Sequence, residues 1–315
     1  MTPNAHADRG AFVHPALFYH NKREYLDALV PFITDGLEAE HPVLVAVPGP
    51  NLAILRHALG RSSRFVMMAD MTEAGRNPGR ILGQLLGGFA DKHPHEPVRM
   101  VGEPIWPSRS EVEYPACVQH EALINHAFTG REVTVVCPYD AAHLDSSVLS
   151  DARRTHPVLW QTGLPAQDST TYAPDAVWAR YNEPLHSAAG AVTYTVRKLA
   201  DLSQARAFAS LYAQWFGLAA EPTAVLPLIV TELATSSLTR ADGPCRLALW
   251  RQDGHLVCEA RGGGYLDDPL AGRRPYRRDT DGGLYVVNGV ADLVRIHSTA
   301  DKTTIHAYLR LEQAA

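Results

Sequence analysis

The sequence predicts an α/β protein with two domains, because 315 residues exceed the length of one typical domain. In the N-terminal half, valine-rich apolar runs alternate with stretches of helical periodicity. This alternation is typical of a parallel sheet that is covered on both faces. In the C-terminal half, a long amphipathic stretch precedes a hairpin signal and glycine-rich turns. That order favours helices on one face of a mixed sheet.

The composition excludes some classes of partner. A net charge of −5 gives no electrostatic basis for direct binding to nucleic acid or to an anionic membrane. The stretch MTPNAHADRG has no apolar signal region, and no apolar run reaches transmembrane length, so we expect a cytoplasmic protein. Cys137 and Cys258 lie in apolar runs without a CxxC pair, so we expect buried, reduced thiols.

Strands and helices alternate through the N-terminal half. Residues 1–11 are expected to form a disordered tail, and residues 22–41 an amphipathic helix. The expected strands are residues 42–48, 64–70, 97–104 and 131–140. Each strand is followed by an expected helix, at residues 49–60, 77–93, 113–128 and 145–157.

A ligand site is expected at the carboxyl ends of these strands, where open α/β sheets usually bind ligands. The candidate side chains of this sensory site are Glu103, Cys137, Tyr139, Asp140 and His20. An alternative is that these segments only shape the crevice and cap helices. The stretch PGPNLAIL after the strand at 42–48 lacks the lysine and hydroxyl of a phosphate-binding loop.

A metal site is a second hypothesis for this half. It would be a metal or thiol-dependent ligand site that uses Cys137 with histidines. Apart from this hypothesis, the polar residues of interest in this half are His14, His20, Glu103, Glu121, Cys137, Tyr139, Asp140 and His156, with no ligand set assigned among them. Zinc sites favour compact Cys and His spacing, and the sequence has none, so no metal site is predicted.

Six segments carry a resemblance to a known family. They are HPALFYHN, PFITDGLEAEHPVLVAVP, RMVGEP, QHEALINHAF, VVCPYD and THPVLW. Together they resemble the MEDS sensory domain, named for methanogens, methylotrophs and DcmR, which is similar to a RecA/KaiC-like core without its nucleotide loop. The resemblance implies a domain over residues 12–162 that senses a small ligand.

Residues 163–190 contain three prolines and little periodicity, which predicts a linker before a second domain at 191–315. The stretch Leu226–Arg240 predicts an amphipathic helix in that domain. On its polar face Glu232 and Ser236 are one turn apart, so they are candidates for the wall of a site. A core helix with a solvated edge is the alternative. The hairpin at residues 245–261 turns at Asp253-Gly254.

Three motifs follow one another in this domain: the helix with Glu232, RGGG at residues 261–264 and DGGLYVV at 281–287. Their order resembles the ATP-binding (GHKL) domain shared by histidine kinases, gyrase-type ATPases and bacterial anti-sigma-factor serine kinases. A phosphoacceptor helix pair is missing, which favours the stand-alone anti-sigma type. The resemblance implies that ATP with magnesium is the cofactor and that Glu232 is the general base. The implied cofactor-binding residues are Ser236, Gly262, Gly264, Gly282, Gly283 and Leu284.

Three positions depart from that family. Ser236 replaces an asparagine that holds magnesium, and Gly262 replaces an aspartate that accepts a hydrogen bond from adenine. Asp281 replaces a glycine and adds a negative charge where phosphates would approach. We therefore expect the fold to be kept and ATP binding to be weakened or lost.

Three functions remain open at this point. The first is a regulator that binds a sigma factor or an anti-sigma antagonist under control of the sensory domain. The second is an active ATP-dependent serine kinase that phosphorylates such an antagonist. The third is a small-molecule sensor whose second domain only forms a homodimer. A basic cluster either contacts phosphate or an acidic partner, or is a solvated loop; it comprises Arg273, Arg274, Arg277 and Arg278.

Overall fold

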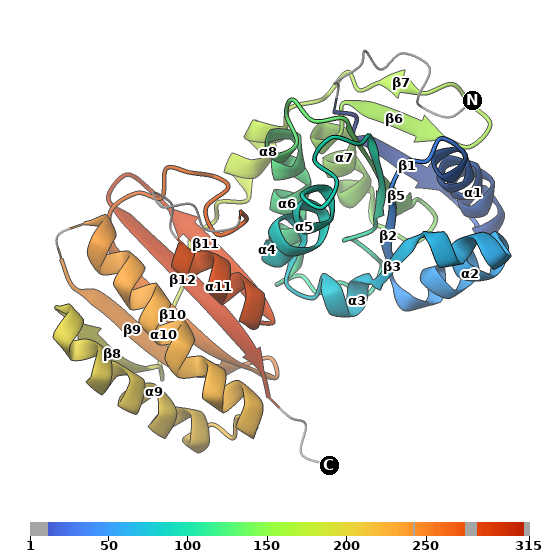
Figure 1. The fold of residues 1–315 in the computed structure, drawn as a ribbon. Coiled ribbons are helices and arrows are strands. Elements are labelled where there is room, and N and C mark those ends of the chain that lie inside the picture. The colour runs from blue at the N-terminus through green and yellow to red at the C-terminus, as the bar shows by residue number, and fades with distance from the viewer. Residues whose placement is uncertain (1–11, 242, 275–281, 312–315) are drawn as a thin grey trace. The chain divides into compact units, whose positions relative to one another are not determined.

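The computed structural model describes residues 12–241, 243–274 and 282–311, and it divides into two compact units at Tyr181 (Figure 1). Both units are α/β, as the sequence predicted. The expected linker at residues 163–190 is divided between them, because residues up to Tyr181 belong to the first unit. Tyr181 is fixed there by its hydroxyl, which donates to Asp151, and by its carbonyl, which accepts from Gln119.

The first unit contains a seven-stranded sheet in the order β3-β2-β4-β5-β1-β6-β7. All of its pairings are parallel except that of β6 with β7. The strands are β1 (Pro15–Tyr19), β2 (Val43–Val47), β3 (Met67–Asp70), β4 (Val98–Gly102), β5 (Val133–Asp140), β6 (Val158–Gln161) and β7 (Gln167–Asp168). The four predicted strands are present. The sequence did not predict β6 or β7. It also did not predict β1, which lies between β5 and β6, because its short apolar run starts at a proline and continues into polar residues.

Helices cover both faces of this sheet (Figure 1). One face packs on α1 (Lys22–Glu38) and α2 (Gly49–Leu59), through a buried cluster that includes Leu17, Leu29 and Leu55. The Asn21 side chain starts α1 by accepting a hydrogen bond from the Glu24 backbone at 3.0 Å. The other helices are α3 (Met71–Ala74), α4 (Pro78–Arg80), α5 (Gly87–Ala90), α6 (Tyr114–Ala127), α7 (Ser146–Thr155) and α8 (Pro174–Arg180).

Two connecting segments of the first unit have other helical forms. Residues Gly60–Phe65 form a 3-10 helix after α2. The single helix expected at residues 77–93 is interrupted, because a π-helical segment, Ile81–Leu86, separates α4 from α5. In the part of the chain that the structure describes, no helix has the length and apolarity needed to cross a bilayer.

The second unit contains a five-stranded sheet in the order β11-β12-β10-β9-β8. The strands are β8 (Val192–Val196), β9 (Cys245–Gln252), β10 (His255–Gly263), β11 (Leu293–Ser298) and β12 (Lys302–Arg310). Among the described residues every neighbouring pair is antiparallel, where a mixed sheet was expected. Between β8 and β9 two successive helices return the chain to the end where β8 stopped, so β9 runs in the opposite direction.

Three helices lie on one face of this sheet (Figure 1): α9 (Leu202–Trp215), α10 (Ala220–Arg240) and α11 (Gly282–Val290). A 3-10 turn, Leu199–Asp201, precedes α9. The predicted apolar stripe of α10 is confirmed, because Leu226, Ile229, Val230 and Leu233 are buried in the core of the unit. The predicted hairpin is also present, and Asp253 and Gly254 both have the positive φ that a tight turn of this kind requires.

Candidate functional site

The residues predicted for the sensory site are only partly brought together, because the Asp140 charge acts on Glu103 whereas Cys137 and Tyr139 lie on the other face of β5. Side chains alternate between the faces of a strand, so Cys137 and Tyr139 on β5 face opposite to Asp140. Cys137 contacts Glu121 of α6, whereas Asp140, at the carboxyl end of β5, bonds His143 at 2.9 Å. His20 is exposed and pairs with Glu24 at 3.1 Å.

Glu103 is the centre of one buried network at the carboxyl edge of the sheet. Its carboxylate accepts from the hydroxyls of Tyr19 at 3.2 Å and Tyr25 at 3.1 Å. The Asn51 amide, in the first turns of α2, donates to both oxygens at 3.0 and 3.1 Å. Burial raises the pKa of Glu103 to about 7, although the hydrogen bonds from Asn51, Tyr25 and Tyr19 oppose that rise.

Two connections at this edge are too short to surround phosphates. Between β1 and α1 the chain contains only His20 and Asn21, and between β2 and α2 only Pro48. A phosphate-binding loop needs several glycine-rich residues between a strand and its helix. Neither of these two connections can therefore bind a triphosphate by that route.

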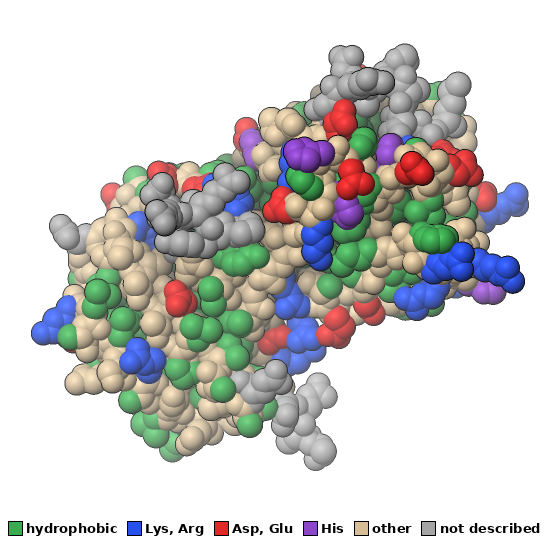
Figure 2. All heavy atoms as spheres, in the orientation of Figure 1, with side chains coloured by type: hydrophobic (Ala, Val, Ile, Leu, Met, Phe, Trp, Pro, Cys, Tyr) green, Lys and Arg blue, Asp and Glu red, His purple; other side chains and the backbone are tan. Residues whose placement is uncertain are grey.

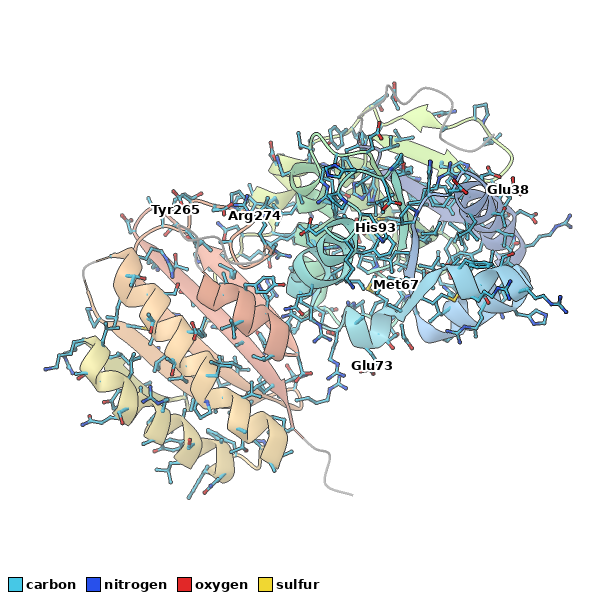
Figure 3. The ribbon with its side chains drawn as sticks, in the orientation of Figure 1. Glu38, Met67, Glu73, His93, Tyr265 and Arg274 are labelled. Carbon is cyan, nitrogen blue, oxygen red and sulfur yellow. The ribbon has the colours of Figure 1, made fainter. Side chains whose placement is uncertain are left out.

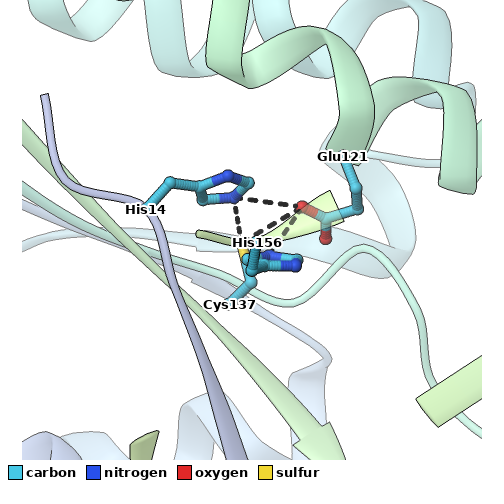
Figure 4. A group of neighbouring side chains, drawn as sticks. All are labelled: His14, Glu121, Cys137 and His156. Atoms are coloured by element: carbon cyan, nitrogen blue, oxygen red, sulfur yellow. Dashed lines mark hydrogen bonds and ion pairs between the residues drawn. The ribbon is translucent and has the colours of Figure 1, made fainter. Parts of the chain in front are cut away.

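A second buried group lies on the α6 face of the same sheet (Figure 4). It comprises His14, immediately before β1, Glu121 of α6, Cys137 of β5 and His156, just before β6. The His14 Nε2 atom lies 3.3 Å from both the Cys137 Sγ and the Glu121 Oε2. The Cys137 Sγ lies 3.3 Å, and the His156 Nε2 3.4 Å, from the same Glu121 oxygen. All four side chains are buried.

The outer nitrogen of each imidazole is fixed by a hydrogen bond. The His14 Nδ1 lies 3.2 Å from the Asn125 Oδ1, and the amide nitrogen of Asn125 donates to the Thr155 carbonyl at 2.8 Å. The His156 Nδ1 lies 2.8 Å from the carbonyl of Ala152. Because both acceptors are oxygen atoms, each Nδ1 carries a hydrogen in the neutral ring, and each Nε2 presents a lone pair to the group.

The burial of the group sets its charges. Burial, with the neighbouring His156, lowers the pKa of His14 to about 4. Burial opposes ionisation of Glu121, but the neighbouring His14 and His156 side chains outweigh it and hold the pKa of this carboxyl well below its usual range. Burial and the Glu121 charge raise the pKa of the Cys137 thiol. Glu121 is therefore an anion beside a neutral imidazole and a neutral thiol.

Residues 13–157 match the family model of MEDS, the MEthanogen/methylotroph, DcmR Sensory domain. The match confirms the resemblance in the N-terminal half, and residues 13–157 are called the MEDS region below. All four members of the buried group lie in it. A search of curated proteins found no match.

The MEDS region also contains a hollow at the opposite, amino-terminal edge of its sheet. It has a volume of ≈ 480 Å³, and its lining includes Val43 and Met67, where β2 and β3 begin, with Phe89 and His93. Met67 and His93 are labelled in Figure 3. No predicted sensory residue and no member of the buried group lines it. The hollow is therefore separate from both networks.

In the second unit the predicted nucleotide residues lie where α10 meets the glycine turns. A Cβ placed on Gly262 would lie 1.8 Å from the Ser237 Oγ, and one on Gly264 would lie 3.1 Å from the Arg240 carbonyl. A Cβ on Gly283 would lie 2.7 Å from the Glu232 Oε2. These glycines thus allow α10 to contact the turns directly.

The other predicted positions in this unit have structural contacts. The Ser236 hydroxyl accepts a hydrogen bond from Arg240 at 2.7 Å. Gly282, Gly283 and Leu284 begin α11, and Leu284 is buried in the core. Of the basic cluster, Arg273 is buried and Arg274 pairs with Asp268. Asp281, Arg277 and Arg278 lie outside the described residues.

One buried charged group in this unit was not predicted. Glu259 lies on the β10 face opposite to Cys258 and accepts hydrogen bonds from Ser187 at 2.9 Å and Arg246 at 2.7 Å. The His306 Nε2 lies 3.0 Å from it. Burial opposes ionisation of Glu259, but His306, Ser187 and Arg261 outweigh it and hold its pKa below the ordinary value. A glutamate alternating with apolar residues was the sequence signal.

Proposed function

We propose that this chain is a signalling regulator whose MEDS region detects a small ligand and whose second unit binds a sigma factor or an anti-sigma antagonist without using ATP. The MEDS match supports the sensory half of this proposal. The proposed binding of a protein partner rests on the motif resemblance of the second unit and on the contacts of its glycines.

The observation that carries the proposal is the contact between Ser237 and Gly262. The resemblance assigns the adenine-binding aspartate to position 262, where a Cβ would lie 1.8 Å from the Ser237 hydroxyl. An aspartate would require Ser237 to move. Without that carboxylate the adenine amino group loses its partner, a loss of about 1–3 kcal/mol. The Ser236 hydroxyl, which would replace a magnesium ligand, is already bonded to Arg240.

An exposed apolar surface supports a protein partner. Leu211 and Trp215 are one turn apart on α9, so they share a face, and they are 63% and 79% exposed. Figure 2 shows hydrophobic side chains gathered over this end of the second unit. Tryptophan side chains exposed to this extent are enriched at sites of protein recognition.

The alternative function is an active serine kinase. It is favoured by Glu232, which remains in place against the first turn of α11 and would act as the general base that deprotonates the acceptor serine. The two functions differ in their need for nucleotide. The regulator binds its partner in the absence of ATP, whereas the kinase transfers phosphate only with magnesium and ATP.

The test measures binding of the full-length protein to purified sigma factors and anti-sigma antagonists, with and without magnesium-ATP. We expect nucleotide-free binding, weakened at least about tenfold by the double substitution Leu211→Ser with Trp215→Ser. Leu164→Ser, an exposed leucine of the first unit, is the matched control and should bind normally. Phosphate transfer that depends on Glu232 would instead establish the kinase.

A further inference from the structure

The ligand atoms of the buried group in the MEDS region have the spacing of a tetrahedral metal site. In such a site zinc lies about 2.0–2.3 Å from nitrogen, oxygen and sulfur ligands, so neighbouring ligand atoms are about 3.3–3.6 Å apart. Four of the six separations here are 3.3, 3.3, 3.3 and 3.4 Å, and the other two, from the His156 Nε2 to the His14 Nε2 and to the Cys137 Sγ, are no longer than 4.8 Å.

The lone pairs of the group converge. Ala152 and Asn125 hold the outer nitrogens of His156 and His14, so both Nε2 atoms face the Glu121 oxygen. Within the described residues, neither the His156 Nε2 nor the Glu121 Oε1 has a hydrogen-bond partner. The His156 Nε2 and the Glu121 Oε2 lie 3.4 Å apart, and both are acceptors. Two buried acceptors repel each other unless a cation or a proton lies between them. The fixed outer nitrogens are also the usual support of histidine ligands to metals.

The charge of the group points to a divalent cation. Glu121 is a buried carboxylate, and a buried anion is unfavourable unless it is paired. A divalent cation that displaced the Cys137 proton would face one carboxylate and one thiolate, which gives a site without net charge. The thiolate and the imidazoles favour zinc or a similar borderline ion over magnesium or calcium, which prefer oxygen ligands.

We propose that His14, Glu121, Cys137 and His156 bind one divalent cation of the zinc type in the core of the MEDS region. All four positions of a tetrahedron are taken by protein ligands, so the site is closed and holds β1, β5, β6 and α6 together. This site does not depend on the proposed function of the second unit.

The competing explanation is a proton on His156 in place of the cation, which would pair with Glu121. The two explanations differ in the state of Cys137, because a metal ligand must be a thiolate, whereas the proton-linked network keeps the thiol.

The experiment titrates full-length protein, stripped of metal by a chelator, with Co²⁺ and then Zn²⁺. We expect one equivalent of Co²⁺ to give a thiolate-to-cobalt charge-transfer band and the visible bands of a tetrahedral ion, and Zn²⁺ to remove both. The protein purified without chelator should contain about one zinc per chain. A protein that gives no such spectrum and carries no metal would overturn the proposal.

Substitutions of the proposed ligands test which side chains bind the cation. Cys137→Ser should abolish the charge-transfer band, and His156→Ala should lower Zn²⁺ affinity by more than about 100-fold. Cys117→Ser, a buried cysteine of α6 outside the group, is the matched control and should keep the band. Loss of the band in that control would contradict the assignment. Should a variant fail to fold by circular dichroism, the cobalt spectrum of the unaltered protein decides the question by itself.

Discussion

The Nε2 atom of His156 lies 3.4 Å from the Oε2 atom of Glu121, with the hydrogen of that imidazole held on its other nitrogen by the Ala152 carbonyl. This arrangement brings a lone pair to a buried carboxylate. It is unfavourable by itself and becomes favourable when a cation is shared.

The support of His14 by Asn125 should affect metal affinity. Asn125→Leu removes the acceptor that fixes the His14 ring, and outer partners of this kind contribute about 10–100-fold to metal affinity. We expect Zn²⁺ affinity, measured by competition with a chromogenic chelator, to fall by that factor. His126→Ala alters the next residue, which pairs with Asp175 outside the group, and should leave the affinity unchanged. Equal losses in both variants would argue against a positioning role for Asn125.

Removal of the metal should destabilise the protein. A cation that binds the folded chain stabilises it by about 2.7 kcal/mol when its free concentration is 100 times the dissociation constant. We therefore expect a chelator to lower the temperature of thermal unfolding of the full-length chain, and added Zn²⁺ to restore it. Cys137→Ser should unfold at one temperature with or without the chelator. An unaltered protein that does not respond to the chelator would contradict this prediction.

The stability of the first unit should depend on the titration of Glu103. Its pKa is raised from 4.5 to about 7, so the folded protein holds a proton that the unfolded chain releases. This contribution to stability is full below pH 4.5 and falls by about 3 kcal/mol as the pH rises to about 7. Glu103→Gln cannot lose a proton, so this part of the pH dependence should disappear from its urea unfolding curves. Parallel curves for the two proteins from pH 4.5 to 8 would show that Glu103 is ionised throughout.

The Gly262 contact predicts overpacking. Gly262→Ala places a Cβ against Ser237, and we expect a loss of about 1–3 kcal/mol in the free energy of unfolding. Ser237→Ala removes the nearer atom and leaves the Ser237 Cβ at 3.2 Å, so the double variant should recover part of the loss. Gly190→Ala is the control, because no atom lies within 4 Å of its added Cβ. Additive effects of the two substitutions would disprove the contact.

The sequence predicted the helices and strands better than it predicted which residues of different elements lie together. The period of α10 identified its buried face, since Leu226, Ile229 and Leu233 all lie in the core. The strand β1 was missed, and with it the position of His14 beside Cys137. These two residues are 123 positions apart, and a search for compact metal-ligand spacing cannot find a group that only the sheet order assembles. The predicted sensory residues were divided because neighbouring residues of a strand face opposite sides.

The glycine motifs show a second reason why the sequence could not predict the contacts of the site. Glycine allows either a ligand or a neighbouring helix to approach the backbone, and the sequence pattern is the same in both cases. Gly262 and Gly283 were therefore found by resemblance, but their contacts with Ser237 and Glu232 required the structure.

We propose that the second unit binds its protein partner without ATP. The most direct measurement is calorimetric titration of the full-length protein with ATP to millimolar concentration, with and without magnesium. We expect no saturable heat in either condition. Saturable binding, with Glu232→Ala retaining it but losing phosphate transfer to an anti-sigma antagonist, would overturn this proposal and establish an active kinase.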